Sequence, residues 1–138
     1  MPPTPSSFST HPQDEAFQNG LAKRTQVMGQ PFVDKAFAGA TEFTLPMQHH
    51  ITRAAWGDVW QREGLDLKTR SLITVAALVT LAREDQLKGH LWRALDNGVT
   101  REEIREVFLQ VGIYAGVPAA IDSFRIAREV FESIDKKA

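Results

Sequence analysis

Residues 67–96 read LKTRSLITVAALVTLAREDQLKGHLWRALD, and this stretch decides the fold class. Its first half, up to Leu81, is apolar nearly all round and holds several β-branched residues, so a buried strand is conceivable. Its length and its paired alanines favour a buried helix. The second half, from Glu84, is amphipathic because leucines recur every four residues, at Leu87, Leu91 and Leu95. Gly89 is the only weak breaker between the halves, so the sequence leaves open whether 67–96 is one helix or two.

The segments before this stretch also carry helix signals. Asp14 to Met28 has apolar residues on one side, and Gly29 ends it. Pro31 opens a short helix over Phe32 to Ala38, and Pro46 opens another that runs to about Trp60, because proline is tolerated in a first turn. Gly64 interrupts the chain there, and Asp66 resembles an N-cap for the next element.

The segments after this stretch give the same picture. Asn97-Gly98 is a C-terminal stop, and Thr100 with Glu103 forms a capping box. Gly116-Val117-Pro118 ends the helix that follows, and a last helix covers about Ala119 to Ser133. No segment alternates apolar and polar residues with hairpin signals at its ends. The predicted fold class is therefore all-α, with about six or seven helices.

Composition limits the kind of protein. The chain has 138 residues, of which 43% are hydrophobic, so we expect a single domain over 13–138 behind a flexible N-terminal arm over 1–12. Net charge is −1 without a basic stripe, which argues against a nucleic-acid partner. The longest apolar run, about 72–82, is too short to span a bilayer. We expect a cytoplasmic protein with no membrane partner.

The absence of cysteine and of common site motifs excludes several chemistries. No cysteine means no disulfide, thiolate metal site or cysteine nucleophile. His49 and His50 are adjacent and would diverge on a helix, and there is no HExxH, so we predict no metal site. No glycine-rich nucleotide loop and no GxSxG elbow is present. We therefore expect no cofactor of these kinds.

Three polar residues at helical spacing form the first candidate site. Arg83, Gln86 and His90 are three and four residues apart, which puts them on one side of a helix. A cation, an amide and an imidazole facing one way could bind a carboxylate and move a proton. The alternative is an ordinary solvated helix face.

A second stripe joins a cation to aromatic rings. His49, Arg53, Trp56 and Trp60 share one helical side, and rings beside a cation suit a flat, anionic ligand. The alternative is that both tryptophans are core or interface anchors. Arg70, beside Ser71 at the start of the apolar segment, is either a ligand contact or half of a structural salt bridge.

Resemblance to a known family gives information about function that residue spacing alone does not give. The runs 70–78, 83–84, 87–91, 94–100 and 103–104, with the continuation 110–120, resemble the carboxymuconolactone decarboxylase family. The upstream run Ile51 to Trp60 is similar to the decarboxylases of that family. The resemblance covers about 20–131, and the combination of motifs is specific although no single piece is.

The wider family includes thiol peroxidases similar to alkylhydroperoxidase D, which carry CxxCxxxH on the equivalent helix and a glutamate one helix earlier. Their cysteine positions fall here on Arg83 and Gln86, the histidine on His90 and the glutamate on Ser71. Thiol chemistry is therefore impossible in this chain, whereas the histidine is retained.

The resemblance implies cofactor-free loss of carbon dioxide from 4-carboxymuconolactone, a step in protocatechuate breakdown, by an alkylhydroperoxidase D-like helical domain. It also implies a homo-oligomer, a hexamer or trimer. On this reading His90, Glu84 and Arg83 are catalytic. The substrate-binding residues are Arg70, Arg53, Trp56, Trp60, Gln86 and His49.

Two other functions stay open at this point. The first is decarboxylation of another conjugated lactone or acid, because a fold does not fix a substrate. Ala54 and the pair His49-His50, which lie on or beside the stripe from His49 to Trp60, depart from the pattern that the resemblance leads us to expect. The second is a non-catalytic oligomeric binding protein that uses the same apolar helices for assembly.

Overall fold

The computed structural model describes residues 14–138 and shows only helices there. Along the chain these are α1 (Glu15–Met28), α2 (Gln30–Ala38), α3 (Leu45–Ile51), the π-helix η2 (Thr52–Val59), α4 (Leu67–Thr80), α5 (Glu84–Asp96), α6 (Arg101–Ala115) and α7 (Val117–Lys137). The all-α prediction is confirmed. The arm predicted over 1–12 lies outside the described residues.

The chain divides into two compact units, Met1–Leu65 and Asp66–Ala138. The first unit holds α1 to η2 and the second holds α4 to α7. The single domain expected over 13–138 spans both units and stays a prediction. No helix in the described part of the chain is long and apolar enough to cross a membrane.

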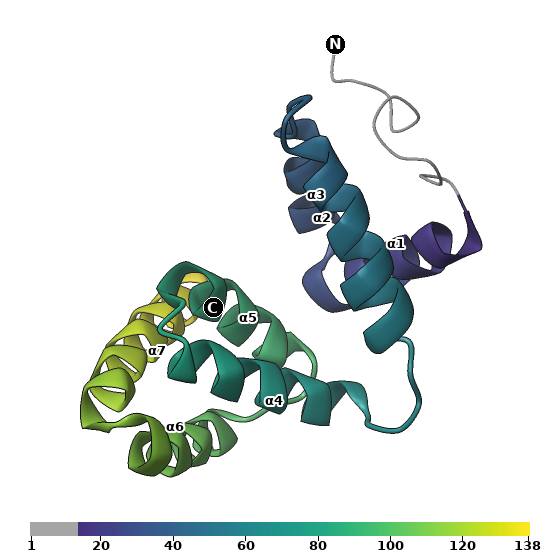
Figure 1. Ribbon diagram of the computed structural model, residues 1–138. Coiled ribbons are helices and arrows are strands. Elements are labelled where there is room, and N and C mark those ends of the chain that lie inside the picture. The colour runs from purple at the N-terminus through teal and green to yellow at the C-terminus, as the bar shows by residue number, and fades with distance from the viewer. Residues whose placement is uncertain (1–13) are drawn as a thin grey trace. The chain divides into compact units, whose positions relative to one another are not determined.

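The first unit is organised by a crossing of α1 over η2 (Figure 1). A β-carbon on Gly20 would lie 1.9 Å from the carbonyl oxygen of Thr52, and one on Gly57 would lie 2.6 Å from that of Ala16. Only glycine allows backbones to approach this closely. The two helices therefore meet backbone to backbone, and the rest of the unit packs around that contact.

The helix predicted to run from Pro46 to about Trp60 changes its hydrogen bonding halfway along. After Ile51 the chain widens into the π-helix, where Trp60 N donates to Ala55 O five residues back at 2.9 Å. The sequence predicted a continuous helix with no such change. The widened turns carry Gly57 at the crossing, where its missing side chain leaves room for α1.

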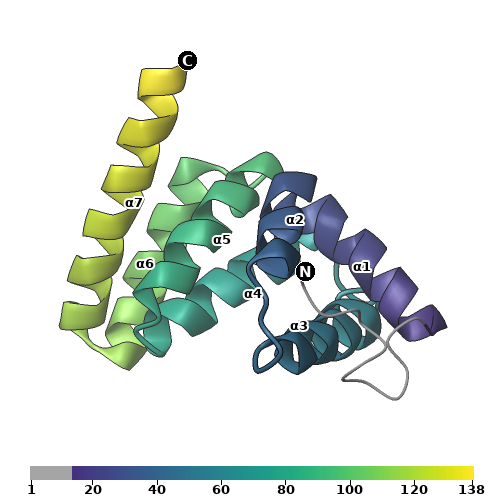
Figure 2. The same cartoon turned by 90° about the horizontal axis from the view of Figure 1, so that it is seen from above.

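The second unit buries one apolar core between its four helices (Figure 2). The helix α7 packs against α5 and α6, and α4 packs against the same two helices. The larger core side chains that are almost fully buried are Val75, Val79, Leu87, Leu91, Ile104, Phe108 and Val130. The leucine repeat of residues 84–96 thus faces the core, as its amphipathic pattern predicted.

Local caps fix where these helices begin. Asp66 accepts a hydrogen bond from Thr69 N at 2.7 Å, and Thr100 Oγ1 accepts one from Glu103 N at 3.1 Å. Both caps are the predicted ones. The Glu103 carboxylate also reaches Lys68 Nζ at 2.7 Å, which ties the start of α4 to α6.

Residues 67–96 form two helices, which answers the question that the sequence left open. The break falls at Leu81 to Arg83, and Gly89 lies undisturbed inside α5. Arg83 N donates to Leu78 O and Ala82 N to Val79 O, which is the Schellman pattern of a helix end. Ala82 takes φ 55°, the left-handed conformation that this pattern requires and that glycine adopts more easily.

Two junctions join helices without a loop, and both use a glycine followed two residues later by proline. Gly29 and Gly116 have φ values of 90° and 106°, a region that only glycine occupies readily. Pro31 and Pro118 then lie in the first turn of α2 and α7. The predicted breaks at Gly29 and Gly116 are confirmed, although α7 begins earlier and ends later than the predicted 119–133.

Replacing Gly20 with alanine tests the backbone crossing. Since the new β-carbon would meet a backbone carbonyl that cannot turn aside, we expect Gly20→Ala to lower the free energy of unfolding by about 3 kcal/mol or more. Urea denaturation followed by circular dichroism measures the change. In Gly89→Ala, the matched control, the added methyl meets nothing within 4 Å. This control should gain up to about 1 kcal/mol. Equal stability of the two variants would refute the crossing.

Candidate active site

The second unit presents Arg83, Gln86 and His90 at the start of α5. Arg83 occupies the N-cap position with non-helical backbone angles, while Gln86 and His90 lie four residues apart on the helix itself. Arg83 and Gln86 are exposed and His90 is half-buried. Burial lowers the pKa of His90 below its ordinary value, so the free chain holds a neutral imidazole at neutral pH.

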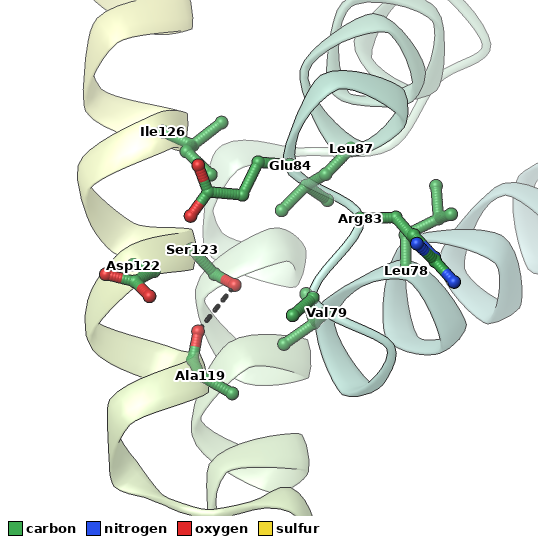
Figure 3. A pocket seen from close by; sticks show the side chains of 10 residues that line it. Leu78, Val79, Arg83, Glu84, Leu87, Ala119, Asp122, Ser123 and Ile126 are labelled. Atoms are coloured by element: carbon green, nitrogen blue, oxygen red, sulfur yellow. Dashed lines mark hydrogen bonds between the residues drawn. The ribbon is translucent and has the colours of Figure 1, made fainter.

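A small cavity lies next to this helix start, and Figure 3 shows its lining. Arg83 and Glu84 both border it, but the Arg83 side chain points toward Leu78 whereas Glu84 points toward α7 (Figure 3). Its volume is about 20 Å³, enough for one water molecule and far below a small-molecule site. The cavity therefore cannot hold an organic acid in this form of the chain.

Glu84 has a partner of its own. Its carboxylate forms an ion pair with Arg125 of α7 at 3.5 Å. Glu84 and His90 are six residues apart, so they lie about 120° apart around the helix and about 9 Å apart along it. The structure therefore gives Glu84 a link to α7 and no contact with His90, and the catalytic role predicted for Glu84 stays a prediction.

Arg70 lies in the first turns of α4, half-buried, directly before the buried Ser71. Its carbonyl oxygen accepts a hydrogen bond from Thr74 Oγ1 at 2.9 Å. Its place in the second unit makes it a candidate anion-binding residue together with Arg83. The sequence left open whether these two arginines share one helix; in the structure Arg70 lies on α4, whereas Arg83 is the N-cap of α5.

The predicted stripe from His49 to Trp60 falls in the first unit, where its members have different surroundings. His49 is 2% exposed and its ring packs against Phe17, with the centroids 5.3 Å apart. Burial lowers the pKa of His49. Arg53 binds both carboxylate oxygens of Asp14, with Nη2–Oδ2 at 2.5 Å and Nε–Oδ1 at 3.2 Å. This bidentate pair ties η2 to the start of α1.

The two tryptophans form a stacked pair, with Trp56 on η2 and Trp60 at its C-cap. Their ring centroids are 4.7 Å apart and the planes are inclined by 30°. Trp56 is buried and Trp60 half-buried, so only the latter can offer part of a ring to a ligand. The structure thus brings the two tryptophans together and engages His49 and Arg53 elsewhere.

One polar residue of the first unit was missed by the sequence reading. Arg24 is 5% exposed on α1. It falls seven residues after Phe17 and three before Val27, which is the spacing of one helix face. That spacing places a cation on the apolar face of α1, and it is the signal that could have singled out this arginine.

Comparison with known proteins gives one family. Residues 46–129 match the model of the carboxymuconolactone decarboxylase family. The chain is 40% identical over 121 residues to 4-carboxymuconolactone decarboxylase of Acinetobacter baylyi, covering 88% of this chain and 90% of that protein. It is also 40% identical over 121 residues to nitrosuccinic acid decarboxylase of Metarhizium robertsii, covering 87% of this chain and 85% of that protein.

Comparing His49 with the adjacent His50 tests how the burial of His49 affects the pH dependence of stability. Because burial lowers the pKa of His49 in the folded chain, the unfolded chain takes up a proton first as the pH falls below about 6.5. Stability present at neutral pH is therefore lost in acid, by at most about 1.4 kcal/mol per pH unit for one proton. We expect His49→Phe to flatten this loss between about pH 7 and pH 5.

The exposed neighbour provides the control, and we expect the slope to be flatter in His49→Phe than in His50→Phe. Urea denaturation at each pH measures both. An equal slope for the His49 variant and the unaltered chain would show that this imidazole takes up its proton equally well in the folded chain.

Proposed function

We propose that this chain, which belongs to the carboxymuconolactone decarboxylase family, removes carbon dioxide from 4-carboxymuconolactone without a cofactor. The observation that carries the proposal is the 40% identity to a decarboxylase of that name over 88% of the chain. The activity belongs to the breakdown of protocatechuate, and we place the protein in the cytoplasm. Two relatives named as decarboxylases favour an enzyme over the non-catalytic binding protein that the sequence left open.

The chemistry of this substrate explains why no cofactor is needed. The leaving carboxylate is attached to a ring carbon that is conjugated through a double bond to the lactone carbonyl. When the carbon–carboxylate bond breaks, its electron pair moves into the ring as a dienolate, and carbon dioxide leaves. A proton then adds to the carbon α to the carbonyl and gives the enol-lactone. The protein must bind the anion, stabilise charge on the lactone oxygen and supply that proton.

We assign the role of proton donor to His90. Its burial holds the free imidazole neutral, but a substrate with two carboxylates would favour the imidazolium when it arrives. The imidazole would take a proton from solvent as the substrate binds. It would pass this proton to the substrate carbon α to the lactone carbonyl after carbon dioxide has left. Gln86, four residues earlier on α5, would donate a hydrogen bond to the substrate from the same side of the helix.

We assign anion binding to Arg83 and Arg70. Guanidinium groups bind carboxylates through paired hydrogen bonds, and Arg83 is exposed at the start of α5. The carboxylate that stays on the product is the better target. Binding the leaving carboxylate equally in ground and transition states would not accelerate the reaction.

First-unit residues have weaker support as substrate contacts. Arg53 is neutralised by Asp14, and His49 and Trp56 are buried. Trp60 keeps part of its ring accessible and is our candidate among them for an apolar wall. Such a wall would favour conversion of a charged carboxylate to neutral carbon dioxide.

Nitrosuccinic acid is a second candidate substrate, because the relative named for it matches the chain at the same 40% identity. It too carries two carboxylates. Loss of the carboxylate beside its nitro group leaves the electron pair on that group as a nitronate, so no cofactor is needed there either. Both candidates are dicarboxylates in which a neighbouring group accepts the electrons.

We also propose that the chain assembles as a homo-oligomer, a trimer or hexamer. Support comes from apolar side chains that are exposed around the junction of α6 and α7. Ile113 is 80% exposed, Tyr114 83% and Val117 64%. An apolar patch of this kind on a compact unit is typical of a surface that another molecule covers.

Carbon dioxide release measures the proposed activity directly. We expect rapid release when 4-carboxymuconolactone is generated in situ from its muconate precursor and the purified protein is added. Release should be undiminished by a chelator. Nitrosuccinic acid, assayed in parallel against its uncatalysed rate, identifies the preferred substrate. Failure of a folded preparation to accelerate either reaction would refute the proposed function.

Variants at His90 and Arg83 should separate proton transfer from binding. We expect His90→Ala and His90→Gln each to lower kcat by about 100-fold, because neither side chain carries a transferable proton. Arg83→Ala should mainly raise KM. His50→Gln, an exposed control, should leave both constants unchanged. Near-normal kcat in His90→Gln would reassign His90 from proton donor to hydrogen-bond donor, since glutamine keeps an N–H group.

A further inference from the structure

The first unit contains a buried cation that the proposed reaction does not use. Arg24 is 5% exposed, and its Nη1 donates to Thr52 Oγ1 at 3.2 Å. The guanidinium carbon lies 5.8 Å from the ring centroids of both Phe32 and Phe37. A neutral hydroxyl and two aromatic faces thus surround a full positive charge.

No carboxylate of the described residues pairs with this charge. Asp14, which starts the same helix, binds Arg53 instead. Residues 1–13 contain no Asp or Glu, so they cannot provide a carboxylate side chain. Burial lowers the pKa of Arg24, but an arginine remains protonated at any ordinary pH. A buried charge without a counter-ion is costly, and proteins rarely leave one in that condition.

Further polar atoms without partners lie in the same region. Arg24 Nε, Gln48 Oε1 and both ring nitrogens of His49 are buried and make no hydrogen bond within the described chain. Thr52 links Arg24 to the end of α3, since its hydroxyl accepts a hydrogen bond from Arg24 Nη1 and donates one to the backbone carbonyl oxygen of Gln48 at 2.7 Å. The Phe37 ring contacts both Arg24 and the His49 ring, whose centroid is 6.2 Å away. Buried polar atoms are nearly always satisfied, so such a group points to a missing ligand.

We propose that Arg24 binds the carboxylate of a flat organic acid in the first unit, with Phe32 and Phe37 against the body of the ligand. The guanidinium supplies the charge-assisted hydrogen bonds. His49, neutral because it is buried, can donate from one ring nitrogen and accept at the other. The Gln48 amide can rotate to turn its nitrogen toward the anion.

A groove between α1 and α2 shares Phe37 with this cluster and would hold the body of the ligand, although Arg24 and His49 do not themselves line the groove. Phe17 and Phe37, the two rings that contact His49, form part of its wall. Its volume is about 480 Å³, within the range of small-molecule sites. Asp34 also lines it but is hydrogen-bonded to Gln30 Nε2 at 2.7 Å. The site is tested by binding alone, so the inference does not rest on the decarboxylase activity.

Benzoate is a suitable probe because benzamide has nearly the same shape without the charge. We expect calorimetric titration of the whole chain to show benzoate binding at least about tenfold more tightly than benzamide, the scale of one charged hydrogen bond. Arg24→Met should abolish that preference. Lys35→Met, which removes one exposed positive charge from α2, should retain it. The ring nitrogen signals of His49 in an NMR spectrum should shift with benzoate while those of the exposed His50 stay constant.

Stability separates this site from a purely structural role for Arg24. Methionine removes an uncompensated charge and keeps apolar volume, so Arg24→Met should unfold at an equal or higher temperature. Should that variant not fold, Arg24→Lys keeps the charge but loses the planar fork, and its benzoate affinity should fall severalfold. Unchanged benzoate affinity in the Arg24 variants, or equal binding of benzoate and benzamide by the unaltered chain, would overturn the inference.

Discussion

Contact between two backbones, α1 and η2, is the constraint on which the first unit depends. At Gly20 and Gly57 there is no space even for a methyl group. The close approach brings Arg24 within hydrogen-bonding distance of Thr52 and Asp14 within reach of Arg53. It also encloses His49 among aromatic rings. The buried polar groups of this unit are therefore held by main-chain geometry, which side-chain substitutions elsewhere would change little.

In the second unit, helix ends determine where the reactive groups lie. α4 stops at a Schellman turn with Ala82 in the left-handed conformation, and the next residue, Arg83, is the N-cap of α5. The leucines of α5 enter the core, which leaves Gln86 exposed and His90 half-buried on the side of the helix that they share. The candidate catalytic groups are thus carried on a helix whose position is set by packing, while their own side chains keep access to a ligand.

Local chemistry explains which features could be predicted. The caps at Asp66 and Thr100 and the breaks at Gly29 and Gly116 are encoded within a few residues, so the sequence predicts them. The π-helix could not be predicted in this way, because it accompanies contacts with α1 between residues more than thirty positions apart, such as Gly20 and Thr52. Ion-pair partners that are distant in sequence also determine which candidate site residues are already engaged within the chain. Neither the pairing of Arg53 with Asp14 nor that of Glu84 with Arg125 follows from any spacing within one helix.

The connection between the two units differs from the tight glycine junctions within them. Residues 62–66 are all exposed, whereas Gly29 and Gly116 join their helices with no intervening loop. Exposed loops are where chains are nicked by proteases and where inserted sequence is tolerated. A fluorescent label or an added domain would therefore be accepted between Arg62 and Asp66. The same insertion at either glycine would separate two helices that pack directly on one another.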